Sequence, residues 1–249
     1  MSKTTDKNSY TIIFAVVMVI VVGSLLAGVA QGLKSKITLN ERFEKMQNIL
    51  YAMGVNENEG DGDVKFIGTD KVEEAFATNI KKQLVFQGDD VTEDPEAYLI
   101  DIKKEEAKAK DPSYKRRLPL FVGEKDGETV YVLPIRGKGL WDAICGFVAI
   151  DQEFVVQGVV FDHAGETPGL GAEIKQRYFM DDFHGEHVMD GEAFKGITVA
   201  KGNNDPINVN KTDNKVDAIA GSTITGDGVT AMLKKDIRLY LPYLKSLNQ

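Results

Sequence analysis

The sequence predicts an α+β fold, in which a single N-terminal transmembrane helix precedes a mixed α/β soluble domain. Three observations predict it: a long apolar run over residues 12–30, several short runs rich in valine and aromatic residues after Leu118, and an apolar stripe over residues 229–244. Strands followed by a packed helix are typical of α+β domains. The fold class therefore follows from the order of the elements.

The composition allows a folded protein and excludes some partners. Of 249 residues, 43% are hydrophobic, which is enough for a sizeable core. The 38 acidic and 30 basic residues leave a net charge of -8, which argues against a nucleic-acid-binding protein. The single cysteine, Cys145, forms neither an intramolecular disulfide nor a zinc or iron–sulfur site alone, and its apolar strand favours a core position. Any redox chemistry would therefore come from a bound cofactor.

The first element is a membrane segment. Residues 12–30 contain Ser24 as their only conventional polar side chain. At about 1.5 Å per residue they span roughly 30 Å, which is one hydrocarbon core. The alternative is a cleaved signal peptide, because Lys3 and Lys7 precede the run and small residues end it at 28–30. The anchor is favoured, since the run exceeds the ~7 to 15 apolar residues of a signal core. The lysines and arginine after the span outnumber the lysines before it, which by itself favours a cytoplasmic soluble domain.

Two helices and a connection are predicted next. Apolar residues recur at helical spacing from Thr38 to Met53, and Gly54 ends that helix. A capping-box-like Asp70-x-x-Glu73 begins a second helix, which carries apolar residues as far as Leu84. The charged segment 105–117 contains a proline and is predicted to be an exposed connection.

The remainder is predicted to be strands and a closing helix. Short runs of valine and aromatic residues are separated by Gly, Asp and Lys turns. The predicted strands lie at 118–123, 129–135, 146–150, 154–162, 197–200 and 216–220. A long amphipathic helix over 229–244 closes the chain.

Three glycine-marked segments are candidate ligand loops: GKGLW at 137–141, ETPGLG at 166–171 and GSTITG at 221–226. The third leads from a strand into a helix, where backbone N–H groups and the helix dipole favour a phosphate. Ser222, Thr223 and Thr225 would donate hydrogen bonds to it. The alternative is that Thr225 or Asp227 is an ordinary helix N-cap. This is no Walker A loop, because the required lysine is missing.

The second segment suggests a flat ligand. Gly169 and Gly171 allow the backbone to approach a ring closely, and Leu170 presents an apolar face. Trp141, the only tryptophan, offers a second wall. The alternative is a simple turn at 166–171 and a tryptophan in the core.

Together, GKGLW, ETPGLGAEI and DAIAGSTIT behind one N-terminal span resemble the NqrC family, the C subunit of the sodium-translocating NADH:quinone reductase. A related family is the G subunit of the Rnf electron-transport complex. The resemblance covers essentially the whole chain. It implies an anchor at residues 1–35, an accessory region at 36–136 and an FMN-binding domain with the C-terminal helix at 137–249.

The resemblance also implies the cofactor and its site. In that family FMN is joined by a phosphoester to the last threonine of Ser-Gly-Ala-Thr-x-Thr, which corresponds to Thr225 here. Ala220 replaces the family's serine and Ser222 its alanine, and the acceptor hydroxyl is retained. No catalytic residue and no metal are expected. The implied cofactor-binding residues are Leu140, Trp141, Glu166, Thr167, Gly169, Leu170, Gly171, Gly221, Ser222, Thr223, Ile224 and Thr225.

The implied function is electron transfer from NADH toward ubiquinone, coupled with sodium export. The expected partners are the other subunits of a membrane reductase, a flavin transferase for maturation, and membrane lipid. The resemblance places the chain in the bacterial inner membrane as a single-pass protein with a periplasmic soluble domain, against the charge count. The alternatives are a ferredoxin-linked Rnf subunit and an anchored assembly module without a redox role.

One further cluster is a candidate metal site. Asp181, Asp182, His184 and His187 lie within seven residues. Gly185 between the histidines argues for a loop, and a surface or capping role is favoured.

Overall fold

The computed structural model describes residues 8–60, 62–202, 205 and 207–248. The chain divides into two compact units, 1–42 and 43–249. The helix α1 (Asn8–Ala52) begins in the first unit, where its side chains are exposed as far as Glu41. It is long and apolar enough to cross a membrane, with an 18-residue window of mean hydropathy 2.9. The apolar N-terminal helix expected from the sequence is therefore present.

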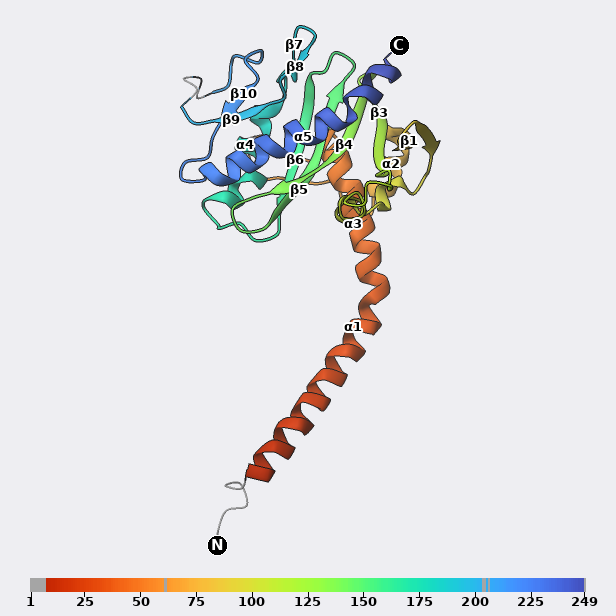
Figure 1. Cartoon of the computed structure of the whole chain (residues 1–249), viewed down its shortest axis with the longest axis vertical. Helices are drawn as coiled ribbons and strands as arrows, with labels where there is room; N and C mark the ends of the chain where they lie inside the picture. The colour runs from red at the N-terminus through yellow and green to blue at the C-terminus, as the bar shows by residue number, and fades with distance from the viewer. Residues whose placement is uncertain (1–7, 61, 203–204, 206, 249) are drawn as a thin grey trace. The chain divides into compact units, whose positions relative to one another are not determined.

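The second unit is built on one antiparallel sheet of six strands, in the order β2-β1-β3-β4-β5-β6 (Figure 1). The strands are β1 (Ile80–Gln87), β2 (Asp90–Glu93), β3 (Leu118–Lys125), β4 (Glu128–Lys138), β5 (Ala143–Asp151) and β6 (Val156–His163). The four predicted strands between 118 and 162 correspond to β3 to β6. Alternating valine, leucine and isoleucine residues bury both faces of these central strands.

The closing helix α5 (Thr223–Leu247) packs against this sheet (Figure 1). Its buried stripe includes Val229, Leu233 and Ile237, which recur at helical spacing. A side chain at Gly137 of β4 would collide with Met232, so this glycine permits close contact between helix and strand. The N-terminus of α5 is thereby placed beside the end of β4.

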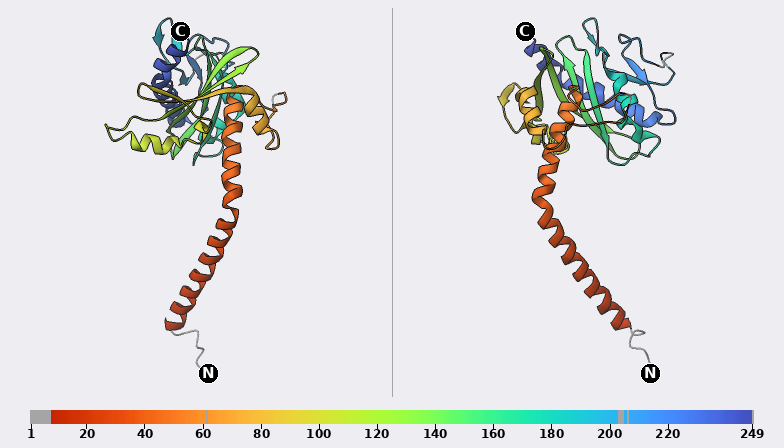
Figure 2. Two further views of the ribbon diagram at one scale, coloured as in Figure 1. Left: turned by 90° about the vertical axis from the view of Figure 1, so that its right-hand side faces the viewer. Right: turned by 180° about the vertical axis from the view of Figure 1, so that it is seen from behind.

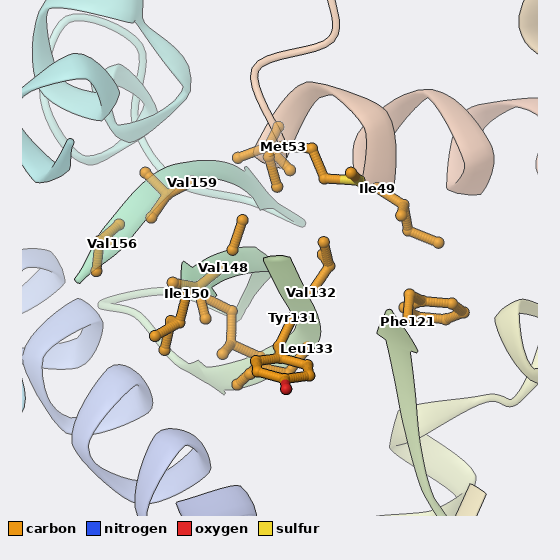
Figure 3. Packing of buried hydrophobic residues seen from close by; sticks show 14 of the residues in the cluster. Ile49, Met53, Phe121, Tyr131, Val132, Leu133, Val148, Ile150, Val156 and Val159 are labelled. Carbon is orange, nitrogen blue, oxygen red and sulfur yellow. The ribbon is translucent and has the colours of Figure 1, made fainter. Parts of the chain in front are cut away.

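The last turns of α1 supply another part of the core (Figures 2 and 3). Ile49 and Met53 are completely buried, and a side chain at Gly123 of β3 would collide with Met53. Gly54, with a φ of 79°, ends the helix where the N–H of Val55 bonds to the carbonyl of Leu50 at 2.9 Å. The predicted stop at Gly54 is confirmed.

The remaining elements are short. They are α2 (Val72–Asn79), η2 (Ala97–Leu99), α3 (Ile102–Lys108), η3 (Gly171–Lys175), α4 (Arg177–Met180), η4 (Asp181–Phe183), β7 (Met189–Asp190), β8 (Ala193–Phe194), β9 (Thr198–Ala200) and β10 (Lys215–Asp217). The strands β9 and β10 pair in parallel, and β7 pairs with β8.

Two local predictions were wrong. The second helix ends at Asn79 rather than Leu84, because residues 80–87 pair with β3 and β2 as strand β1. Its N-cap is Lys71, not Asp70. The segment 105–117 is not simply an exposed connection, since its first residues belong to α3. Glu105 is buried and accepts hydrogen bonds from the hydroxyl of Tyr114 and the N–H of Arg117.

The predicted α+β class is confirmed, because a long apolar helix precedes an antiparallel sheet with packed helices. Strands from both sides of the predicted boundary at 136 and 137 share the sheet, and β4 crosses it. The division into accessory and FMN-binding regions stays a prediction about function.

Candidate cofactor site

The three glycine-marked segments meet at one cleft. GKGLW leaves the end of β4, ETPGLG connects β6 to η3, and GSTITG leads into α5. The cleft has a volume of about 220 Å³. Nine of the twelve predicted cofactor-binding residues line it: Leu140, Glu166, Thr167, Leu170, Gly171, Gly221, Ser222, Thr223 and Ile224. Trp141, Gly169 and Thr225 lie outside the lining.

The N-terminus of α5 forms one wall of the cleft. Ser222 is the N-cap, and its side chain makes no capping hydrogen bond, so the cap is neither Thr225 nor Asp227. Its hydroxyl oxygen is buried and has no hydrogen-bond partner among the described residues. The preceding Gly221 has a φ of 77°, a conformation that favours glycine. Because the first N–H groups of a helix lack intrahelical acceptors, this wall presents donors suited to an anion.

A buried carboxylate links two of the three segments. The Thr225 hydroxyl donates to Oε2 of Glu166 at 2.6 Å, and the N–H of Trp141 donates to Oε1 at 2.9 Å. Glu166 is 4% exposed and Thr225 is 2% exposed. Burial raises the pKa of Glu166, but hydrogen bonds from Thr225 and from the N–H groups of Trp141 and Asp142 outweigh it. The pKa of Glu166 is therefore below its ordinary value, and the group is ionised at neutral pH.

Two glycines make room for this pair. A Cβ at Gly139 would lie 2.5 Å from Oε1 of Glu166. A Cβ at Gly171 would collide with Oε2 of Glu166 and lie 2.6 Å from the Thr225 hydroxyl oxygen. Both positions thus require glycine because the carboxylate occupies the space of a side chain.

Apolar side chains surround the mouth of the cleft. Trp141 is 69% exposed, and its indole N–H donates to the Thr167 hydroxyl at 3.1 Å. It is therefore not a core residue. Leu140, Leu170 and Ile224 are also exposed. An aromatic ligand would find apolar surface here and hydrogen-bond donors at the helix terminus.

The remaining candidates take structural contacts. The N–H of Gly169 donates to Glu173, which stabilises the turn of the ETPGLG loop. His184 contacts the carbonyl of Gln157 through Nδ1 at 3.0 Å, and Asp181 pairs with Arg177. Within the described residues no group of three or more metal-ligating side chains forms. Cys145 is largely buried, and burial raises its pKa to about 11.

Sequence reasoning missed two features of the site. The sequence predicts Glu166 only as a loop residue, but its contact with Thr225 joins positions 59 residues apart and depends on the tertiary fold. Gly139 is not among the predicted site residues, although this glycine lies within the GKGLW motif. The buried, unpartnered hydroxyl of Ser222 is likewise visible only in three dimensions.

Comparison with known proteins supports a flavin site in this region. A model of the FMN-binding domain matches residues 139–238, which include the whole lining of the cleft. The C subunit of the Na(+)-translocating NADH-quinone reductase of Yersinia pestis is 30% identical over 246 residues, which cover 91% of this chain and 87% of that protein. The corresponding protein of Neisseria meningitidis serogroup B is 28% identical over 99% of this chain and 98% of its own length.

Solved structures agree. The crystal structure of the same subunit from Parabacteroides distasonis matches with a TM-score of 0.70 at 30% identity, covering 85% of this chain and 96% of that one. Shewanella oneidensis NqrC matches with a TM-score of 0.64 at 26% identity, covering 83% and 99%. From sequence, fold and domain together, the chain belongs to the NqrC family, the C subunit of the Na+-translocating NADH-quinone reductase, which has an FMN-binding domain.

Proposed function

We propose that the chain carries FMN through a phosphoester to Thr225 and transfers electrons within the reductase complex, on the path from NADH toward ubiquinone that is coupled with sodium export. The observation that carries the proposal is the meeting of all three motif segments at one cleft beside the N-terminus of α5. The relatives' names supply the complex, and the FMN-binding domain supplies the cofactor class.

The residues present are compatible with FMN. The unpartnered Ser222 hydroxyl and the N–H groups of the first turn of α5 would bind the phosphate. Leu140, Trp141 and Leu170 would contact the ring. The cleft, at about 220 Å³, is smaller than the roughly 300–1,000 Å³ of sites that enclose a drug-sized ligand. It would therefore hold the phosphate end and leave much of the ring accessible to redox partners.

FMN supplies reversible electron transfer when bound, and the chain supplies position and surroundings. Thr225 holds the phosphate end at a fixed place in the fold, which prevents loss of the cofactor. Gly169 and Gly171 keep the ETPGLG loop close to the cleft without a side chain in the way. Trp141 is oriented by its bond to Thr167.

The apolar part of α1 would anchor the chain in the bacterial inner membrane, with the soluble domain on the periplasmic side. Its partners would be the other subunits of the reductase, membrane lipid, and a flavin transferase that attaches FMN. The side of the membrane follows from the family resemblance, because long domains are translocated largely regardless of flanking charge.

Intact-mass spectrometry of the chain from its native membrane tests the proposal. We expect one added FMN, located by peptide mapping on the segment containing Thr225, and abolished by Thr225→Val. Thr78→Val is the matched control, because Thr78 is exposed on α2 and bonds only to the carbonyl of Glu74 in that helix. An unmodified wild-type mass, or flavin retained by Thr225→Val, would refute the proposal.

A further inference from the structure

We propose that Glu166 is the base that accepts the Thr225 proton when the flavin phosphoester forms. This inference rests on the proposed attachment of FMN to Thr225. It adds that the chain itself carries the group that activates the acceptor hydroxyl, rather than presenting a bare threonine to the transferase.

The first support is the geometry of the pair. The Thr225 hydroxyl points its hydrogen at Oε2 of Glu166 over 2.6 Å, a short distance typical of a hydrogen bond to a charged oxygen. Both side chains are buried, at 4% exposure for Glu166 and 2% for Thr225, so water does not compete for either. A general base must lie within hydrogen-bond reach of the proton that it takes, and Glu166 does.

The second support is that the carboxylate is oriented. Its other oxygen, Oε1, accepts the N–H of Trp141, and the N–H of Glu166 itself donates to Nδ1 of His163 at 3.2 Å. Gly139 and Gly171 leave space that only the carboxylate fills. One oxygen is thus held by the GKGLW segment, and the other remains for Thr225.

The third support is the charge of the site. Glu166 is ionised at neutral pH, because the hydrogen bonds that it accepts lower its pKa more than burial raises it, and His163 lowers it further. A threonine hydroxyl is a weak nucleophile at neutral pH and needs an adjacent base. Within the described residues, Glu166 is the carboxylate that bonds to this hydroxyl.

The chemical step balances with one named co-reactant, a flavin nucleotide whose phosphate is part of a phosphoanhydride, as in a flavin dinucleotide. Oγ1 of Thr225 forms a bond to that phosphorus while its proton moves to Oε2 of Glu166. The anhydride P–O bond breaks, and the leaving mononucleotide takes the electron pair. Nothing is oxidised or reduced.

The test measures the rate of flavin attachment to the full chain, expressed together with its flavin transferase, by fluorescence of the denatured protein and by intact mass. We expect Glu166→Gln to slow attachment by about 100-fold or more, the contribution of a general base. Glutamine keeps the shape and still accepts a hydrogen bond, but it takes no proton. Glu166→Asp keeps the charge and should recover part of the rate. Glu192→Gln, at an exposed site in the β7–β8 turn, is the matched control and should behave as wild type.

A purely structural role predicts the reverse order, with glutamine better than aspartate, and that order would overturn the inference. Attachment to Glu166→Gln at the wild-type rate would also overturn it while leaving the proposed function intact. A wild-type chain without covalent flavin would refute both.

A second pair of variants keeps the inference testable if Glu166→Gln does not fold. Gly171→Ala introduces a methyl group that displaces the Glu166–Thr225 pair without changing its charge, and attachment should fall. Gly165→Ala lies in the same connection and meets only Cβ of Asp142, at 3.7 Å, so its rate should match wild type. Equal rates for the two variants would contradict the inference.

Discussion

At the scale of single residues, Ser222 shows how the site departs from its family resemblance. The family motif has alanine at this position, whereas Ser222 adds a hydroxyl that is buried at the N-cap of α5 without a partner in the described structure. An unsatisfied buried hydroxyl costs free energy unless a ligand satisfies it. The added donor therefore belongs with an anion in the cleft.

The unpaired hydroxyl predicts opposite effects of Ser222→Ala on the two forms of the protein. Without flavin, the free energy of unfolding should be unchanged or slightly higher, because an unpaired polar group is removed. With flavin attached, the variant should lose about 1 to 3 kcal/mol of the stabilisation that loading confers on wild type. Thermal unfolding of both forms checks this, and a clear destabilisation of the flavin-free variant would contradict it.

A second buried group predicts a pH dependence. Glu186 is completely buried, and its Oε2 has no partner in the described structure. Burial raises its pKa to about 7, against the hydrogen bond from Asn208, which lowers it. An acid with a raised pKa in the folded state binds more protons than the unfolded chain, so folding stability falls as the pH rises from about 4.5 to 7.

Glu186→Gln should remove this contribution. The unfolding free energy of the variant relative to wild type should therefore rise between pH 4.5 and pH 7, by about 2 to 3 kcal/mol. Denaturant unfolding at several pH values measures it. A difference that does not change with pH would show that Glu186 keeps its ordinary pKa.

At the scale of elements, α5 connects the core to the site. Its apolar stripe packs on the sheet, and this packing places the first turn of the helix beside the ends of β4 and β6. Local propensity contributes less, since the helix begins with threonine, isoleucine and glycine and includes Pro242. The position of Thr225 thus depends on burial further along the helix.

Truncation of the stripe should test that dependence. Ile237→Ala removes a fully buried side chain and should lower the unfolding free energy by about 2 to 5 kcal/mol. Leu239→Ala, at a position 37% exposed on the same helix, is the control and should cost about 1 kcal/mol or less. Denaturant unfolding separates the two, and equal losses would contradict the packing of the stripe as the source of the helix's position.

At the scale of the whole molecule, the two units have different environments. Residues 8–40 expose apolar side chains that suit a membrane, while the buried core of the second unit begins at Met46. A chain that begins at residue 36 retains the last turns of α1 and all six strands of the sheet. It should therefore be recovered in the soluble fraction with the melting temperature of the full chain. Recovery only as aggregates would show that the membrane segment contributes to folding.

Hydrophobic pattern and turn chemistry in the sequence were enough to predict the membrane helix, the four central strands and the closing helix. Periods of 2 and 3.6 are local and persist over many residues there. They failed at residues 80–87, where a helical spacing of apolar residues lies in a strand, because pairing with β3 on one side and β2 on the other overrides local preference. They also failed at Glu105, whose burial depends on partners at 114 and 117.

For the site, the sequence alone determined which segments have the glycines and hydroxyls that a flavin phosphate needs, because those properties belong to the residues themselves. Only the tertiary structure decided that Ser222 is left without a partner in the part of the chain that the structure describes, that Trp141 is exposed, and that Glu166 accepts the Thr225 hydroxyl. The reason is physical: burial and hydrogen bonding are properties of atoms brought together by the packing of α5 on the sheet, across 59 positions of chain in the case of Glu166 and Thr225.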